Sequence, residues 1–102
     1  MLALRPNCEH CNKDLAPDAL DAQICSYECT FCSNCVEQVL HNVCPNCGGG
    51  FTPRPIRPAQ NRKNGNYLGN DPASTTRIWK PVVAEVHAAF IKDLEMIPAH
   101  LR

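Results

Sequence analysis

Apolar residues in the first half of the chain are mostly scattered singly, but one short stretch follows a helical pattern. The spacing i, i+3, i+4, i+7, which is typical of a helix with one buried face, occurs at Val36, Val39, Leu40 and Val43. A helix of about two turns is not stable alone in water, so we expect it to pack within a small folded unit. Just before it, residues 23–25 and 30–31 are predicted to form a short hairpin.

The C-terminal quarter carries a second helical pattern. Pro81 suits the first turn of a helix, and Pro98 ends it. The apolar face between them consists of Val82, Val83, Val86, Phe90, Leu94 and Ile97. We therefore predict an amphipathic helix within residues 77–102. This face must be covered by the first half of the chain, by a second copy or by a protein partner. The candidate interaction residues are Trp79, Val83, Val86, Phe90 and Leu94.

Residues 59–76 separate these two parts of the chain. They are rich in Asn, Gly, Ser and Thr and contain few apolar residues, which predicts a flexible linker. Residues 51–58 contain three prolines and are expected to be extended. The predicted organisation is therefore a folded module at residues 1–58, a linker at 59–76 and a C-terminal amphipathic helix at 77–102.

All eight cysteines lie between positions 8 and 47. They form four closely spaced pairs, namely Cys8/Cys11, Cys25/Cys29, Cys32/Cys35 and Cys44/Cys47. Tetrahedral zinc takes four thiolates, and a C-x2-C turn, or knuckle, supplies two of them from one rigid unit. The pairs therefore predict two structural zinc ions, each with four cysteine ligands. Because such sites have no open position, we expect neither enzyme activity nor a small-molecule substrate.

Disulfide bonds and an iron–sulfur cluster are two alternatives to zinc for these cysteines. Eight cysteines also permit a disulfide framework, but dense C-x2-C spacing favours metal. The run from Cys29 to Cys35 begins like an iron–sulfur motif, but position 39 holds Val where that motif needs its next cysteine. Zinc would also stabilise the fold, because a module of about fifty residues with few aromatic side chains has marginal stability without a metal or a crosslink.

The four pairs can be shared between two ions in sequential or in interleaved order. Only two residues separate Cys29 from Cys32, so these neighbouring pairs lie back to back and favour different ions. The interleaved order is therefore preferred. It assigns one ion to Cys8, Cys11, Cys32 and Cys35 and the other to Cys25, Cys29, Cys44 and Cys47.

Charge divides the chain into unlike halves. Residues 1–50 carry two basic and six acidic side chains, and residues 51–102 carry eight basic and four acidic ones. Eight thiolates with two Zn²⁺ make the first half still more negative, which disfavours contact with nucleic-acid phosphates. Nucleic-acid binding stays open as an alternative function through the basic residues Arg54, Arg57, Arg62 and Lys63.

The sequence also bears on location. No apolar run reaches the roughly 18 residues that a membrane-spanning helix needs. The residues ahead of Cys8 are too few for the apolar core of a signal peptide. We therefore expect a cytoplasmic protein whose thiols stay reduced, with no membrane partner.

The stretch from Cys29 to Leu40 resembles the centre of a RING finger. In that family a His or Cys, one residue, Phe and then Cys-x2-Cys precede an apolar residue and a short helix. The string Cys44-Pro45-Asn46-Cys47 is similar to the closing Cys-Pro-x-Cys of the family, and all seven gaps between the cysteines fall within its pattern. The resemblance implies a small zinc-stabilised α+β fold with a RING-like cross-brace. It also implies that Phe31, Val36 and Leu40 pack between the two zinc sites.

A RING ligase acts as a docking scaffold for a ubiquitin-conjugating enzyme. The positions of its docking groove correspond here to His10, Val39, Pro45 and Gly48, of which Pro45 matches the family well and Val39 weakly. More narrowly, residues 1–58 resemble the small bacterial family catalogued as domain of unknown function 1272. The matching strings are Leu4-Arg5-Pro6-Asn7-Cys8 and Pro53-Arg54-Pro55-Ile56-Arg57-Pro58. That resemblance implies zinc binding and no known activity. The function expected is a non-catalytic, zinc-binding, protein-interaction scaffold, with a ubiquitin-ligase-like docking module as an alternative.

Overall fold

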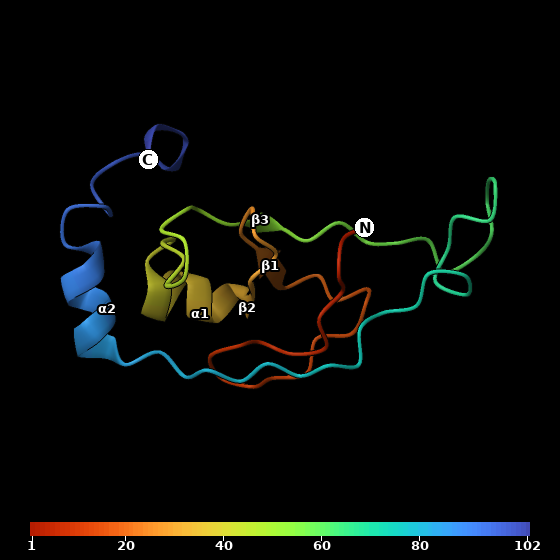
Figure 1. Cartoon of the computed structure of the whole chain (residues 1–102), viewed down its shortest axis with the longest axis horizontal. Helices are drawn as coiled ribbons and strands as arrows, with labels where there is room; N and C mark the ends of the chain where they lie inside the picture. The colour runs from red at the N-terminus through yellow and green to blue at the C-terminus, as the bar shows by residue number, and fades with distance from the viewer.

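Two short strands flank the turn that carries Cys25 and Cys29. In the computed structural model, which describes residues 1–102, β1 (Ala22–Ile24) pairs antiparallel with β2 (Thr30–Cys32), and Gln23 lies opposite Phe31. The strand β3 (Thr52–Pro53) adds to the other edge of β1, which gives the order β2-β1-β3 (Figure 1). The predicted hairpin and the extended segment that closes the module are both confirmed.

The helix after β2 begins earlier and ends earlier than its apolar pattern suggests. It consists of α1 (Ser33–Cys35) and a π-helical continuation at Val36–Leu40. It ends there because His41 and Asn42 adopt left-handed backbone angles, with φ values of 51° and 58°. Val36 and Leu40 are buried, as the helical spacing predicts, and so is Val43 beyond the helix end.

The core lies between the sheet and this helix, and it contains cysteines together with apolar side chains. Phe31 and Leu40 are almost fully buried, and Val36 is buried beside them. The ring of Phe31 meets that of Phe51 edge to face, with centroids 5.5 Å apart. The packing of Phe31, Val36 and Leu40 among the cysteines agrees with what the RING resemblance implies. The fold is thus a small α+β unit built around cysteine clusters.

Two arginines fasten the segment after β3 to the N-terminal loop. The buried Arg54 donates hydrogen bonds to the carbonyl oxygens of Arg5 and Ala16, at 2.8 and 2.9 Å. Arg57 donates to the carbonyl oxygens of Leu2 and Asp71, at 2.7 and 2.8 Å. Beyond them, residues 59–76 contain no helix or strand and extend away from the module (Figure 1). The flexibility of this stretch stays a prediction.

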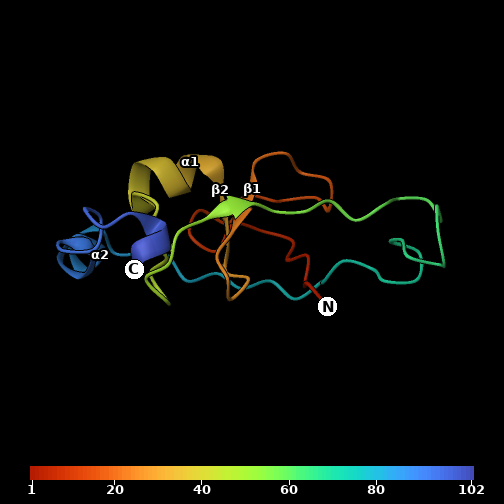
Figure 2. The same cartoon turned by 90° about the horizontal axis from the view of Figure 1, so that it is seen from above.

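The C-terminal segment, residues 77–102, folds back on the module. Its first part, residues 77–82, runs extended beside the N-terminal loop and leads into α2 (Ala84–Ile91). Figure 2 shows this extended stretch and α1 on opposite sides of the strands. A 3-10 turn at Ala99–Leu101 follows near the C-terminus. No helix is long and apolar enough to cross a membrane.

The C-terminal helix differs from its sequence pattern in length and in the face it buries. It starts at Ala84 because the backbone N–H groups of Lys80 and Val82 donate to Glu9 and His10, which keeps that stretch extended. On α2 the buried residues are His87 and Ile91, whereas Val86 is 67% exposed. The ring of His87 selects this face through its Nε2, which lies 3.0 Å from the carbonyl oxygen of Leu40.

Candidate metal centres

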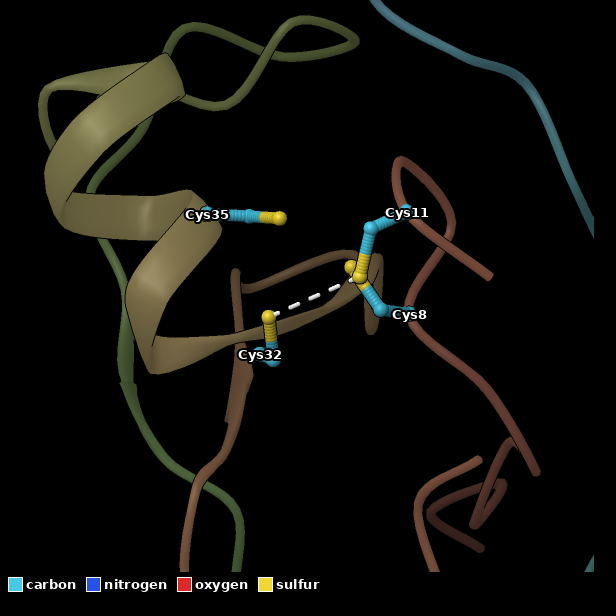
Figure 3. A group of neighbouring side chains, drawn as sticks. All are labelled: Cys8, Cys11, Cys32 and Cys35. Carbon is cyan, nitrogen blue, oxygen red and sulfur yellow. Dashed lines mark hydrogen bonds between the residues drawn. The ribbon is translucent and has the colours of Figure 1, made fainter. Parts of the chain in front are cut away.

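Four cysteines from two distant parts of the chain converge on one point. Cys8 and Cys11 come from the first knuckle, while Cys32 ends β2 and Cys35 ends α1 (Figure 3). Their four Sγ atoms all lie within 4.8 Å of one another, and the Sγ atoms of Cys11 and Cys32 are 3.8 Å apart. A zinc ion with Zn–S bonds of about 2.3 Å requires S–S separations of roughly 3.8 Å. The cluster of Cys8, Cys11, Cys32 and Cys35, cluster 1, therefore has the dimensions of a tetrahedral zinc site.

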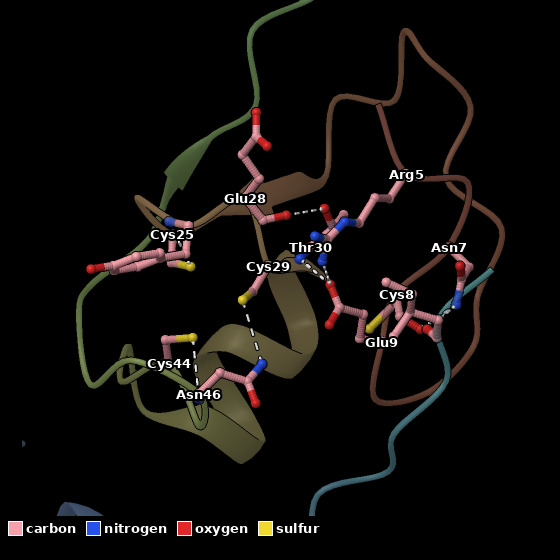
Figure 4. A network of polar contacts seen from close by, with 12 residues as sticks. Arg5, Asn7, Cys8, Glu9, Cys25, Glu28, Cys29, Thr30, Cys44 and Asn46 are labelled. Atoms are coloured by element: carbon pink, nitrogen blue, oxygen red, sulfur yellow. Dashed lines mark hydrogen bonds and ion pairs between the residues drawn. The ribbon is translucent and has the colours of Figure 1, made fainter. Parts of the chain in front are cut away.

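Cluster 1 is held together by the side chain of Glu9, which lies inside the first knuckle. The Glu9 carboxylate accepts the backbone N–H of Thr30 at 2.6 Å and pairs with Arg5 at 2.8 Å (Figure 4). The Glu9 backbone N–H also donates to the carbonyl oxygen of Thr30, at 3.0 Å. Since Thr30 precedes Cys32 by two residues on β2, these bonds fix one half of cluster 1 against the other.

The remaining four cysteines make a second cluster. The Sγ atoms of Cys25, Cys44 and Cys47 lie within 4.8 Å of one another. Cys29 is next to this group but outside that mutual limit, and the Asn46 side-chain amide donates to its sulfur at 3.4 Å (Figure 4). We call these four residues cluster 2. The two clusters together have the interleaved, cross-braced order expected from the spacing.

Backbone N–H groups point at the sulfurs of cluster 2. Tyr27 donates to Cys25, Asn46 to Cys44 and Gly49 to Cys47, each at 3.4 Å. Such donors stabilise the thiolate form of a cysteine, because a hydrogen bond to the charged form favours it. The last knuckle closes through Gly48, whose φ of +78° lies in the left-handed region that favours glycine. The local backbone is thus arranged to present charged sulfurs.

Burial opposes that charge while the thiols carry no metal. Burial is the main cause that raises the pKa of Cys8, Cys29, Cys35 and Cys44 above the usual value of a thiol. Burial also acts on Cys11, but the Lys13 N–H and the neighbouring thiols outweigh it and lower its pKa. A cation resolves this conflict between burial and charge, because it neutralises the thiolates in place. The clusters therefore suit metal binding coupled to proton release.

The two histidines nearest to the ligands do not join them. The ring Nδ1 of His10 accepts the backbone N–H of Val82 at 2.9 Å, so His10 serves as an anchor for the C-terminal segment. His41 is exposed at the end of the helix. Each cluster therefore offers sulfur ligands alone.

Comparison with known proteins gives a family for this chain. Residues 1–57 match the family described as "Protein of unknown function (DUF1272)". The chain belongs to this family. An uncharacterized protein of Rhizobium meliloti (strain 1021) is 54% identical over 81 residues, which cover 79% of this chain and 89% of the relative. No solved structure matches the chain.

The family match confirms the narrower of the two resemblances and contains every cysteine. Residues 1–57 also include Glu9, Thr30 and Arg5, which hold cluster 1 together. The likeness to the Rhizobium protein is longer than the family match, so it reaches into the residues beyond position 57. Part of the chain outside the cysteine-rich module is therefore shared as well.

Sequence reasoning missed three polar residues that organise this site. Glu9 is one of them, and the signal that could have found it is a charged residue inside a metal knuckle. Asn7 is fully buried and donates to the carbonyl oxygens of Cys8 and Ile78, at 3.1 and 2.9 Å. His87 is buried on α2, and no sequence signal distinguishes it from a solvated histidine.

Three of the five predicted interaction residues, Val83, Val86 and Phe90, line a cavity. Trp79, Val83 and Val86 are each more than half exposed, and Phe90 is 45% exposed. Leu94 is partly buried beside Gly48. The cavity has a volume of about 410 Å³, and Phe31 and Pro45 of the module also line it. The predicted apolar face is therefore still largely open in the folded chain.

Proposed function

We propose that this protein is a non-catalytic scaffold in which two structural zinc ions support a surface for protein partners. The observation that carries the zinc assignment is the geometry of cluster 1, where four sulfurs lie within 4.8 Å of one another. That spacing leaves room for one ion at a tetrahedral centre. Cluster 2 supplies the same ligand type, with Cys29 as the fourth ligand.

Zinc at these clusters would have a structural role. It would be held by Cys8, Cys11, Cys32 and Cys35 in cluster 1 and by Cys25, Cys29, Cys44 and Cys47 in cluster 2. Bound there, zinc supplies charge neutralisation and crosslinking, and four thiolates leave no open coordination position for a substrate. In small zinc domains the binding free energy, about 10–16 kcal/mol, is also the folding free energy. We expect the same coupling here, in a reducing compartment such as the cytoplasm.

The surface for partners is proposed to be the open apolar face around Trp79, Val83, Val86 and Phe90. Single exposed apolar residues are ordinary, but a contiguous apolar patch is typical of a protein interaction site. Here Val83, Val86 and Phe90 line a cavity of about 410 Å³, and Trp79, earlier in the same segment, is 60% exposed. A partner that inserts an apolar side chain there would exclude water from both.

This proposal is tested by capturing partners with tagged full-length protein in extracts of the source organism. The Val86→Asp variant places a charge on the exposed face of α2, and Met96→Asp, at an 86% exposed residue, is the matched control. We expect the wild-type and Met96→Asp proteins to capture a shared partner that Val86→Asp loses, with equal zinc content in all three. Identical captures by all three proteins would contradict the proposal.

Two alternative functions find less support. Of the four basic residues considered for nucleic-acid binding, Arg54 and Arg57 are engaged with backbone carbonyl oxygens of the chain itself. That leaves Arg62 and Lys63, which are exposed in the linker. Two positive charges offer few phosphate contacts.

The ubiquitin-ligase-like alternative requires an open groove between the knuckles. At that place, His10 is bonded to Trp79 and Val82 of the C-terminal segment. A Cβ atom at Gly48 would meet the side chains of Phe90 and Leu94, at 3.6 Å each. The C-terminal segment of the same chain therefore covers two of the four groove positions.

A further inference from the structure

The extended stretch before α2, residues 77–82, is fastened to the first knuckle and its flanks. The indole N–H of Trp79 donates to the carbonyl oxygen of His10 at 3.0 Å. The backbone N–H of Lys80 donates to the carbonyl oxygen of Glu9 at 2.8 Å, and that of Val82 donates to the His10 ring at 2.9 Å. Glu9 and His10 are the two residues between the ligands Cys8 and Cys11.

The ends of this stretch are fastened to the same loop. The side-chain amide of Asn7 donates to the carbonyl oxygen of Ile78 at 2.9 Å. The Arg77 guanidinium donates to the backbone and side-chain oxygens of Asn12, at 2.9 Å each, and pairs with Asp14 at 2.7 Å. The hydrogen bonds found between residues 77–82 and the rest of the chain thus all end on residues 7–14.

These partners have the right geometry only while the first knuckle keeps its shape. The knuckle holds Asn12 in the left-handed region, with φ 63°, and the Asn12 N–H bonds to the carbonyl oxygen of Cys8 at 2.9 Å. A C-x2-C turn is kept in this form by the metal that its two thiolates share. The acceptors for residues 77–82 therefore depend on an ion in cluster 1.

We propose that metal occupancy of cluster 1 controls whether the C-terminal segment is docked. With the metal bound, residues 77–82, which include Trp79, are fixed, and the following residues Val83, Val86 and Phe90 are presented in one arrangement beside the module. When cluster 1 loses its metal, the acceptors on residues 7–14 disperse and residues 77–82 are released, while α2 keeps its own bond from His87 to Leu40. The inference rests on the proposed function, because it makes the interaction face dependent on metal occupancy.

The weak burial of the segment makes such release feasible. Trp79 is 60% exposed although its indole N–H is bonded, and α2 buries only His87 and Ile91. Besides these two residues, Val82 packs partly buried against the core, so the apolar area that holds the segment once its hydrogen bonds are lost is small. A docked element with few buried contacts is the kind that opens locally in folded proteins.

Linkage makes this coupling reciprocal, which provides a test in the full-length protein. If metal in cluster 1 favours docking, then docking favours metal in cluster 1 by the same factor. The Val82→Pro variant removes the N–H that bonds to His10 and leaves every ligand in place. Val82→Ala is the matched control, because it shortens the same side chain and keeps the N–H that bonds to His10.

The measurement is the rate at which excess chelator removes zinc from each cluster. Zinc loss is followed by absorbance of the chelator, and Trp79, the one tryptophan of the chain, reports release by fluorescence. For Val82→Pro we expect one of the two ions to leave roughly tenfold faster, as for the loss of one or two hydrogen bonds. The other ion should leave at the wild-type rate, and Val82→Ala should release both ions at rates close to those of the wild type.

Hydrogen exchange assigns the effect to a cluster. Cys11→Ser and Cys47→Ser remove one exposed ligand each, from cluster 1 and cluster 2. We expect the amides of Lys80 and Val82 to lose protection in Cys11→Ser and to keep it in Cys47→Ser. The inference is overturned if Val82→Pro releases both ions at wild-type rates, or if the two serine variants protect these amides equally. A zinc content of two in the wild-type protein, with either of those results, would leave the proposed zinc scaffold standing and reject only the coupling.

Discussion

Removal of the Glu9 carboxylate should weaken one zinc site selectively. Glu9 is 3% exposed, and its carboxylate joins Arg5 and the Thr30 N–H across the two halves of cluster 1. Breaking a buried ion pair by removing one partner typically costs about 3–5 kcal/mol. The Arg5 side chain is 22% exposed and can turn to solvent, which favours the lower end of that range. In Glu9→Ala the Thr30 N–H also loses its acceptor.

This loss should appear as weaker zinc binding, because folding and binding are coupled in small zinc domains. A cost of about 3 kcal/mol corresponds to roughly a hundredfold weaker binding. We expect this change for the ion of cluster 1 in Glu9→Ala, and a smaller one, about tenfold, in Glu9→Gln, which keeps an acceptor for Thr30. The assay is a competition titration of the full-length protein against a coloured zinc chelator, with two resolved binding steps.

Glu37→Ala is the matched control, since it removes the same charge at an exposed position of the helix. Its two zinc affinities should equal those of the wild type. If Glu9→Ala binds both ions as tightly as Glu37→Ala does, the carboxylate does not hold cluster 1 together, and the reasoning from its burial and its contacts is refuted.

Three further predictions follow from the core, the thiols and the last knuckle. Phe31→Leu removes the edge-to-face contact with Phe51 and should lower the free energy of unfolding by about 1–2 kcal/mol with both zinc ions retained; a thermal midpoint equal to wild type would contradict this. Because burial raises the pKa of Cys8 and Cys44, their metal-free thiols hold protons at neutral pH. Zinc affinity should therefore fall as pH falls, by up to roughly 10⁴ per ion and pH unit if four protons are taken up. A zinc affinity that does not change with pH below neutrality would contradict this. Gly48→Ala, at φ +78°, should lower the free energy of unfolding, measured by chemical denaturation, by about 1–2 kcal/mol. An equal decrease in a Gly49→Ala control would argue against backbone strain as the cause.

The parts of the fold that were predictable are those fixed by local spacing. The separation of Cys29 from Cys32 by two residues places consecutive cysteine pairs in different clusters, which is the interleaved order seen in the structure. The buried positions Val36 and Leu40 followed from helical periodicity, although the left-handed residues that end the helix at His41 did not.

The parts that could not be predicted depend on contacts between distant residues. The apolar spacing of the C-terminal segment left open what covers Val83 and Val86, and the structure shows that the bond from His87 to Leu40 turns another face of α2 toward the module. The sequence places Arg54 among the basic residues that could bind nucleic-acid phosphates. In the structure its side chain is buried and bonded to carbonyl oxygens 38 and 49 residues away. Neither contact leaves a periodic signal in the sequence.

The central claim is that eight cysteines bind two structural zinc ions. Native mass spectrometry of the full-length protein, purified under reducing conditions, tests it most directly. We expect a mass excess of two zinc ions per chain over the metal-free protein. A single ion, no metal, or a mass that includes iron and sulfide would contradict it.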